Sequence, residues 1–317
     1  GPVWVMMAKQ ATLSAMVLNC SAADKDGPTY DEYLDNGVLR VGIEVDEYGG
    51  AITYLSLSGE TRNLVNNHDR GRQIQQSYYA GQSLDRTAEG QRAHWSPWPW
   101  NPIQVGDTYG NSARVDEVTN DGKTMYVKTL PLLWDMKDEP AECFFETWIH
   151  LDRNTVHVRN KLTSHRTDDK WVAEPRHQEL PAVYIIADFA KLMTYEGSEP
   201  FTRAELKQIH NDGPPWHSWG HVESTEKWAA LVDDDLWGVG VYNKDAELFT
   251  GGFHGTPGGG EFDAATGYIS PLRTIALDKN DTLEYEYDLI VGTLDEIRAF
   301  VYAAEGHDYE ERQEPSN

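Results

Sequence analysis

The chain has 317 residues, of which 39% are hydrophobic, and this is enough to form a large core in one or two domains. Its formal charge of −25 would repel a nucleic-acid backbone, so DNA and RNA binding are disfavoured. No run of residues approaches the ~20 apolar residues that span a membrane, so no transmembrane segment is expected. The charge is typical of a chain kept soluble in a saline habitat, where salt screens self-repulsion, and it also counts against a strongly polyanionic substrate.

The first 30 residues have the pattern of a leader and linker. Gly1-Pro2 is typical of a protease scar, and a short apolar stretch, Ala15–Leu18, precedes Cys20. This order is similar to the end of a bacterial lipoprotein signal, although Asn19 stands where a small residue is usual. We expect either a lipid anchor through Cys20, on a secreted, periplasmic or outer-surface bacterial protein, or a leader with an incidental cysteine.

Strand patterns dominate residues 31–305, which we predict to be one domain, and an acidic tail follows over 306–317. Val38–Val45 and Ala51–Leu57 flank the turn signal Tyr48-Gly49-Gly50 and predict a hairpin. Asp152-Arg153-Asn154 predicts the turn of a second hairpin. The further strands that we expect are Thr124–Leu130, Cys143–Leu151, Thr155–Leu162, Ala182–Asp188, Lys227–Val232, Gly238–Tyr242 and Thr282–Val291.

Helix signals are few. Thr293 and Glu296 form a capping-box pattern ahead of a helix over Leu294–Ala304, and a short helical turn is expected at Thr202–Gln208. Many short strands joined by polar loops indicate an all-β fold. We predict a single large antiparallel β-sandwich or super-sandwich with long functional loops and a short C-terminal helix.

Three irregular stretches, 66–114, 164–180 and 208–226, break the strand pattern, and loops of this length are usually functional. Arginine forks and amides bind sugar hydroxyls or carboxylates, and the first stretch is dense in them. The competing interpretation is a polar loop whose arginines pair with its own carboxylate. Its candidate residues are Asp69 for catalysis and Arg70, Arg72, Gln76, Tyr78 and Tyr79 for substrate binding.

Tryptophans are concentrated in two proline-containing loops, around residues 94–102 and 214–221. Proline disfavours both helix and central strand there, so the rings either line a surface or fill the edge of a core. Rigid aromatic faces stack on the apolar faces of sugar rings, whereas the alternative is packing beneath the loops. The residues proposed for a sugar platform are Trp98, Trp100, Trp216 and Trp219.

Charged residues run directly into two apolar strands. Arg176, His177 and Glu179 precede one strand, and Glu223 precedes another. If the first segment is extended, His177 and Glu179 share a face, which would let the histidine tune the carboxyl pKa or act as an acid-base group itself. The alternatives are a salt bridge between Arg176 and Glu179 and a solvated carboxylate at Glu223.

No spacing of histidine or cysteine resembles a zinc signature, and Cys20 and Cys143 make no disulfide framework. We expect no cofactor, with structural calcium held by loop carboxylates as the alternative. No serine lies in a Gly-x-Ser-x-Gly elbow, so a serine triad is not predicted.

The opening pattern resembles the first strands of galactose-mutarotase-like β-super-sandwich proteins. The similarity rests on Asn36–Ile43, Gly49–Ile52, Asn66 and Asp69–Arg72, within the first third of the chain. It implies sugar binding in a concave sheet face, although fold alone does not determine the chemistry. The chain lacks the Asn-His-x-Tyr-Phe-Asn-Leu stretch that carries an epimerase histidine, and this puts simple mutarotation in doubt.

These patterns favour an enzyme that cleaves glycosidic bonds of an oligo- or polysaccharide. Hydrolysis needs two carboxyl groups, for which Asp69 and Glu179 are proposed, with Glu223 in reserve. A polysaccharide lyase is the first alternative, with His177 or a tyrosine as base and arginines that neutralise a uronate. A non-catalytic surface glycan-binding lipoprotein is the second.

Overall fold

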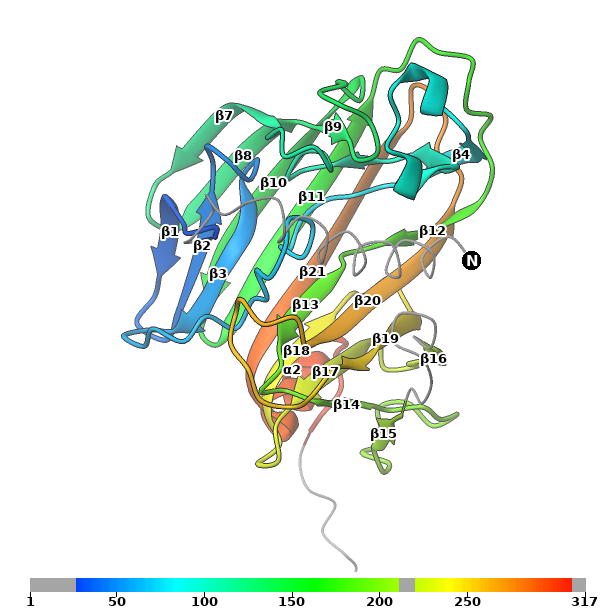
Figure 1. The fold of residues 1–317 in the computed structure, drawn as a ribbon. Helices are drawn as coiled ribbons and strands as arrows, with labels where there is room; N and C mark the ends of the chain where they lie inside the picture. Colours follow the sequence, from blue (N-terminus) through cyan, green and yellow to red (C-terminus); the bar gives the residue numbers. More distant parts are fainter. Residues whose placement is uncertain (1–26, 211–219, 310–317) are drawn as a thin grey trace, which may run out of the picture.

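The computed structural model describes residues 27–210 and 220–309 (Figure 1). Cys20, Trp216 and Trp219, which carry predictions above, lie outside these residues. Within the described ranges the chain forms two large antiparallel sheets, three small sheets and one α-helix. No helix there is long and apolar enough to cross a membrane. The fold is the all-β sandwich with a short C-terminal helix that the sequence predicts.

The larger sheet has nine strands among the described residues, in the spatial order β15-β14-β17-β18-β21-β11-β10-β8-β7. The predicted second hairpin is present, since β10 and β11 pair antiparallel around the turn that holds Arg153. The bounds are β7 (Arg114–Asn120), β8 (Thr124–Leu130), β10 (Cys143–Asp152), β11 (Thr155–Ser164), β14 (Lys191–Thr194), β15 (Lys207–Ile209), β17 (Trp228–Val232), β18 (Trp237–Tyr242) and β21 (Thr282–Thr293).

The second large sheet, which we call the smaller sheet, follows the order β12-β20-β19-β16, and β13 also pairs with β20. Its strands are β12 (Arg176–Glu179), β13 (Val183–Ile186), β16 (His221–Glu223), β19 (Leu248–His254) and β20 (Thr266–Ile275). The sequence patterns predicted only β13 among them. This sheet carries most of the candidate site, so its registers matter for the argument below.

The small sheets hold the N-terminal part of the chain. The first predicted hairpin is β2 (Leu39–Glu44) with β3 (Ala51–Leu57), and β1 (Glu32–Asp35) pairs with β2. The other pairs are β4 (Ala80–Leu84) with β5 (Trp98–Trp100) and β6 (Pro102–Ile103) with β9 (Leu132–Leu133). Two short 3₁₀ helices, Thr87–Glu89 and Ala93–Trp95, lie in the loop between β4 and β5.

The main core lies between the two large sheets. Because side chains alternate along a strand, each sheet contributes every second residue to it. From the larger sheet come residues such as Phe145 and Val158, and from the smaller sheet Ile185, Phe249 and Ile269, all at most 1% exposed. The sandwich therefore leaves one outer face on each sheet.

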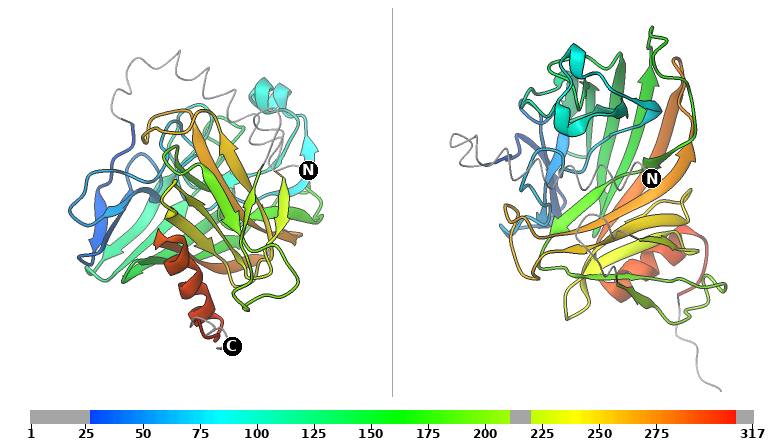
Figure 2. Two further views of the ribbon diagram at one scale, coloured as in Figure 1. Left: turned by 90° about the horizontal axis from the view of Figure 1, so that it is seen from below. Right: turned by 45° about the vertical axis from the view of Figure 1, so that its right-hand side comes forward.

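Helix α2 (Leu294–Ala304) covers part of the outer face of the larger sheet, where β17, β18 and β21 lie (Figures 1 and 2). The predicted capping box is confirmed, since the Thr293 hydroxyl accepts a hydrogen bond from the Glu296 backbone and the Glu296 side chain accepts one from Thr293. Ile297 and Val301 pack against Trp228 and Ile290 in a second apolar cluster.

The predicted helical turn at Thr202–Gln208 is wrong. Residues 203–206 have no regular structure, and Lys207–Ile209 form β15. Arg203 has a φ of 60°, a left-handed conformation that does not continue an α-helix. Its backbone N–H donates instead to the Tyr302 hydroxyl of α2, 2.9 Å away.

Candidate functional site

One face of the smaller sheet lies on the side away from the main core and carries polar side chains around a small buried cluster of Tyr184, Tyr268 and Leu272. Cross-strand partners project to the same side of a sheet, and neighbours along a strand project to opposite sides. Because Val183, Phe249 and Ile269 belong to the main core, the residues next to them project outward. We call this outward side the site face. It holds His177 and Glu179 of β12, Tyr184 of β13, Tyr268, Ser270, Leu272 and Thr274 of β20, Leu248, Thr250 and His254 of β19, and His221 and Glu223 of β16.

Glu179 is the most strongly perturbed carboxyl of the site face. It is 5% exposed, and its Oε1 and Oε2 accept hydrogen bonds from the hydroxyls of Tyr79 (2.9 Å) and Tyr268 (3.1 Å). Burial raises the pKa of Glu179 to about 7, and the two hydroxyl donors oppose this shift. A carboxyl that exchanges its proton near neutral pH is suited to general acid-base catalysis.

A series of contacts leads from Glu179 to Asp69. The rings of Tyr268 and Tyr184 lie 4.9 Å apart between centroids, and the Arg72 guanidinium lies 6.0 Å from the Tyr184 centroid. Arg72 Nε is 3.2 Å from Asp69 Oδ2. Burial raises the pKa of Tyr184 well above its usual value, and the nearby charges of Glu179 and Asp69 add to this while Arg72 opposes it. The two predicted carboxyls are therefore connected through three intervening side chains, Tyr268, Tyr184 and Arg72.

Two histidines meet over the site face. The rings of His177 and His221 are edge to face with centroids 5.4 Å apart, although β12 and β16 stand at the two ends of the strand order. Three spacings of a flat sheet would be roughly 14 Å, so the sheet must curve for the two rings to touch. His177 Nδ1 hydrogen-bonds with the Thr274 hydroxyl at 2.9 Å. Burial lowers the pKa of both histidines, which favours their neutral forms.

Glu223 and its neighbour Glu226 have different environments. Glu223 is exposed at the rim of the site face and lies in the same cross-strand row as Glu179, through Leu272 and Leu248. Glu226 is fully buried and pairs with the Arg298 guanidinium of α2 through two hydrogen bonds of 3.0 Å. Glu226 thus ties α2 to the sheet, and Glu223 is the accessible carboxylate.

Sequence patterns did not identify Tyr268, Thr250 or His254 as site residues. Thr250 is 1% exposed, and its hydroxyl has no hydrogen-bond partner among residues 27–210 and 220–309. These three residues belong to β19 and β20, where Gly251, Gly252 and Pro271 weaken the strand signal. The alternation of Tyr268, Ser270 and Leu272 with core residues was the signal that could have revealed β20.

Three predicted substrate-binding residues of the first loop, Arg70, Gln76 and Tyr78, make their polar contacts within the protein. Arg70 donates to the backbone oxygens of Glu47 and Val105 and lies over the Tyr48 ring. Gln76 donates to Glu146 O and the Thr147 hydroxyl, and its Oε1 accepts from the buried Tyr78 hydroxyl. These contacts stabilise the loop, as in the structural interpretation that the sequence left open, while Tyr79 and Arg72 reach the site face.

Arg176 projects to the opposite side of β12 from His177 and Glu179. Its guanidinium donates to Gly81 O and lies 3.4 Å from the Glu174 carboxylate. The alternative salt bridge between Arg176 and Glu179 is therefore not the one that forms. In this position Arg176 joins β12 to β4 and does not reach the site face.

Trp98 and Trp100 are buried and do not form a surface platform. They are 2% and 1% exposed. Trp98 packs edge to face against Trp95, with its Nε1 donating to Asn101, and Trp100 Nε1 donates to Ala141 O. A sugar cannot reach rings enclosed in this way, so the alternative of packing beneath long loops describes them.

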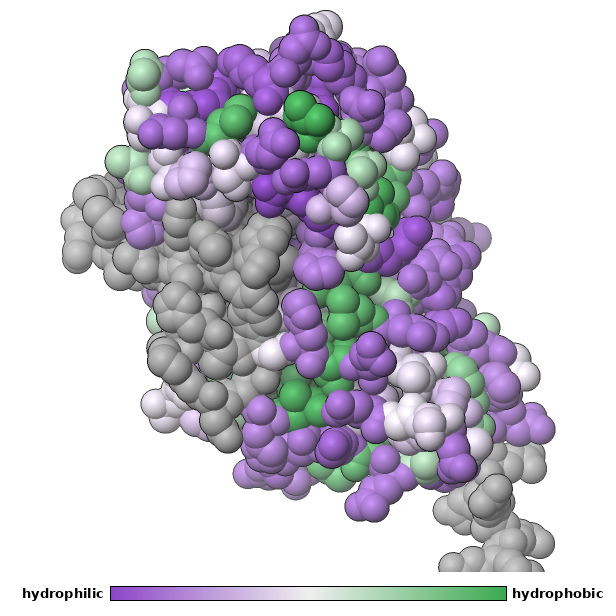
Figure 3. Space-filling model, turned by 90° about the vertical axis from the view of Figure 1, so that its right-hand side faces the viewer, coloured by the Kyte–Doolittle hydropathy of each residue, from purple (hydrophilic) through white to green (hydrophobic). Residues whose placement is uncertain are grey.

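Of the described residues visible from the side of β4, β12 and β16, most are hydrophilic, and a narrow hydrophobic band lies between them (Figure 3). Among the described residues, no group of three or more His, Cys, Asp or Glu side chains is arranged to hold a metal ion. The polar groups that line the site face are carboxyl, imidazole and hydroxyl groups.

Known proteins resemble the chain only in their structures. No family model and no curated protein matches the sequence. A galactose mutarotase-related enzyme from Lactobacillus acidophilus is similar over 82% of this chain and 97% of its own, with a TM-score of 0.46 and 10% identity. A galactose mutarotase-like protein from Lactobacillus casei covers 82% and 99%, with a TM-score of 0.45 and 10% identity.

A GH36 α-galactosidase from Geobacillus stearothermophilus is similar over 85% of this chain and 42% of its own, with a TM-score of 0.47 and 12% identity. Galactose mutarotase-like proteins, which the opening sequence pattern resembles, are thus among the solved structures similar to this chain. At such identities the likeness concerns the fold alone.

Proposed function

We propose that the chain is a carbohydrate-active enzyme that hydrolyses glycosidic bonds, with Glu179 as its general acid. The observation that carries the proposal is the buried Glu179 carboxyl, which two tyrosine hydroxyls hold and whose pKa burial raises to about 7. Glycoside hydrolysis needs one carboxylic acid that keeps its proton and gives it to the leaving oxygen. Near neutral pH most carboxyls have lost that proton, whereas Glu179 retains it in a large fraction of molecules.

Asp69 is the second carboxyl that we assign, as the base or nucleophile. Burial raises its pKa, but Arg72 at 3.2 Å opposes this and favours the ionised form. Asp69 Oδ2 pairs with Arg72 and both Asp69 oxygens are buried, so a water or a sugar would have to enter beside Arg72 to reach them. Glu223, exposed at the rim, is the alternative second carboxyl, and the two are separable by mutation.

The described residues favour hydrolysis over β-elimination. A lyase needs a base and a cation that neutralises the uronate carboxylate. Burial raises the pKa of Tyr79 well above its usual value, and the Glu179 charge adds to this, so a phenolate base is disfavoured. Arg72 is engaged by Asp69 and by Ala264 O, and Arg176 faces away. His177 is the remaining candidate base for such a mechanism.

The test is a panel of neutral and uronic-acid polysaccharides on which new reducing ends and ultraviolet absorbance are measured together. We expect reducing ends without absorbance on a neutral glycan. Glu179→Gln should lower kcat by about 10²–10⁴-fold, the usual contribution of a general acid. Asp69→Asn should lower it comparably, and Glu205→Gln, at an exposed glutamate outside the site face, is the matched control.

Four outcomes would contradict the proposal or one of its assignments. Absorbance at the unsaturated-uronate band would make the chain a lyase. Retention of a glycan without products would make it a binding protein. Full activity of Glu179→Gln would show that Glu179 is not the general acid. Full activity of Asp69→Asn together with loss of activity in Glu223→Gln would show that Glu223, and not Asp69, is the base or nucleophile.

A further inference from the structure

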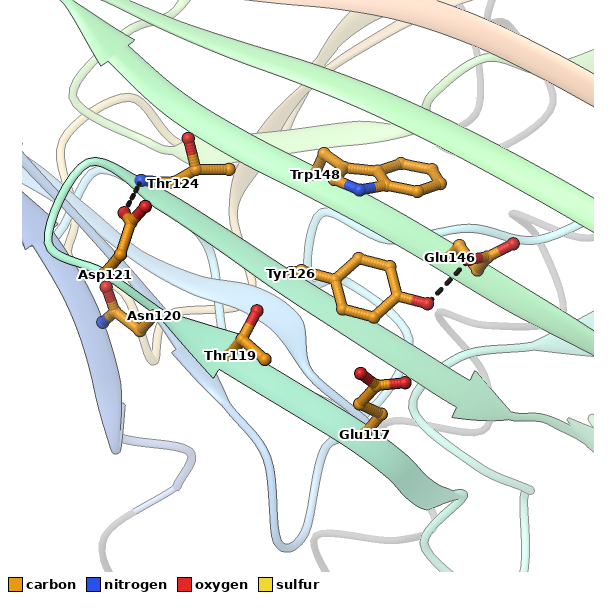
Figure 4. A pocket seen from close by; sticks show the side chains of 8 residues that line it. All are labelled: Glu117, Thr119, Asn120, Asp121, Thr124, Tyr126, Glu146 and Trp148. Carbon is orange, nitrogen blue, oxygen red and sulfur yellow. Dashed lines mark hydrogen bonds between the residues drawn. The ribbon is translucent and has the colours of Figure 1, made fainter.

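The larger sheet has a hollow on the part of its outer face that α2 leaves uncovered. It lies over β7, β8 and β10 and has a volume of about 520 Å³ (Figure 4). Its lining residues are Glu117, Thr119, Asn120, Asp121, Thr124, Tyr126, Glu146 and Trp148. The site face belongs to the outer side of the other sheet, so the main core separates the two.

Two aromatic side chains form the floor of this hollow. Tyr126 and Trp148 are direct cross-strand partners, and their ring centroids lie 5.2 Å apart at 45°. The Arg159 guanidinium lies 3.8 Å from the Trp148 centroid and packs against that ring from the next strand. The two rings stand on the adjacent strands β8 and β10, and Arg159 of β11 supports Trp148. Rigid aromatic surfaces contact the apolar faces of sugars at low entropic cost.

Carboxylates surround the Tyr126 ring. Glu146 Oε2 accepts a 2.7 Å hydrogen bond from the Tyr126 hydroxyl, and in Figure 4 the Glu117 carboxylate lies beside the same ring. Burial raises the pKa of Tyr126, and the hydrogen bond to Glu146 and the charges of Glu146, Glu117 and Asp116 add to this.

The nearby cations do not neutralise these two glutamates. Within the described ranges neither Glu117 nor Glu146 forms an ion pair, since Lys128 pairs with Asp116 and Arg159 pairs with Glu284. An aromatic floor between unpaired carboxylates favours a ligand with apolar ring faces and positive charge, because the ring quadrupole and the carboxylates both attract a cation.

We propose that this hollow is a second carbohydrate-binding site, separate from the site face, that takes an oligosaccharide carrying free amino groups. A glucosamine-type sugar meets both requirements, since its ring stacks on Tyr126 and Trp148 while its ammonium group lies between Glu117 and Glu146. A neutral N-acetylated sugar offers the ring without the charge. The site therefore discriminates by charge, and it does so independently of whether the site face is hydrolytic.

The experiment is calorimetric titration of a glucosamine tetrasaccharide into the full chain carrying Glu179→Gln, which prevents turnover if the proposed function is correct. We expect one binding event that weakens as salt is raised, and a much weaker one for the N-acetylglucosamine tetrasaccharide. Glu117→Gln should weaken binding about two- to fivefold, as for one partly exposed charge pair. Trp148→Leu should weaken it roughly tenfold through the lost ring contact.

Equal affinity for the two tetrasaccharides would overturn the proposal, as would affinity unchanged by both variants. If Trp148→Leu fails to fold, the double variant Glu117→Gln with Glu146→Gln replaces it in the test. Loss of binding in His221→Ala with no effect of Glu117→Gln would locate the ligand on the site face and also overturn the proposal. Hydrolytic activity plays no part in the readout, so failure of the proposed function would be seen separately.

Discussion

The Tyr268 hydroxyl donates a 3.1 Å hydrogen bond to Oε2 of Glu179 and so joins a central strand of the smaller sheet to its edge strand β12. Hydrogen bonds to a carboxylate favour its ionised form, whereas burial favours the protonated form. Burial is the larger effect at Glu179, and the pKa of about 7 is the result. The balance between these two influences sets the pH range in which Glu179 can donate a proton.

Tyr268→Phe should therefore move the alkaline limb of the kcat profile to higher pH. Removal of the donor destabilises the carboxylate and raises the pKa of Glu179 further, so the acid stays protonated to higher pH. The profile would be measured on the glycan that the panel identifies. Tyr242→Phe is the matched control, because that hydroxyl donates to Glu305 at the end of α2, on the outer face of the larger sheet, and its profile should coincide with that of the wild type. A limb that moves to lower pH in Tyr268→Phe would contradict the assignment.

Glu179 also makes the free energy of unfolding depend on pH. Burial raises the pKa of Glu179 from its ordinary value of 4.5 to about 7 in the folded state. Between these values the unfolded chain has lost a proton that the folded chain keeps, so stability falls as pH rises from about 4.5 to about 7 and then levels. The shift corresponds to a loss on the order of 3 kcal/mol. Urea unfolding of Glu179→Gln over this range should lack that part of the slope, and an unchanged slope would show that Glu179 is not the titrating group.

Thr250→Val should not destabilise the fold. The Thr250 hydroxyl is buried without a hydrogen-bond partner in the described ranges, so replacing it with a methyl removes an uncompensated polar group. The free energy of unfolding, measured in urea, should therefore equal that of the wild type or exceed it by about 1–3 kcal/mol. Thr129→Val is the matched control, since the Thr129 hydroxyl donates to Gly49 O at 2.6 Å and its loss should destabilise the fold. A clear loss of stability in Thr250→Val would show that its hydroxyl forms a hydrogen bond in the folded protein.

The sequence predicted the regular parts of the fold well, because they follow local rules. β3 and β8 begin and end at the predicted residues, and the capping box of α2 is present. β19 and β20 were missed because glycine and proline within them suppress the alternation signal while neighbouring strands supply the pairing. Tertiary pairing therefore determines these strands more than their own composition does.

The candidate site was predictable residue by residue only where an extended segment entered a strand. His177 and Glu179 share a face, as their spacing predicted, and both lie on the site face. The sequence does not distinguish Arg70 and Gln76, which bond to the protein itself, from Arg72, which reaches the site face. The difference depends on distant backbone oxygens such as Val105 O, to which Arg70 donates. The tryptophan loop was ambiguous for the same reason, since proline excludes helix and central strand but not burial.

Trp98→Ala should act on stability and not on glycan affinity. The ring is 2% exposed and packs against Trp95 and Tyr79, so its removal leaves a cavity and should cost about 3–5 kcal/mol of unfolding free energy. The measurement is urea unfolding of the variant beside glycan binding at low temperature, where the variant remains folded. Trp148→Ala is the matched comparison, because Trp148 is half-buried at the hollow and its loss should cost less stability. A stable Trp98→Ala variant with lost glycan affinity would restore the tryptophan platform and show that the loop opens in solution.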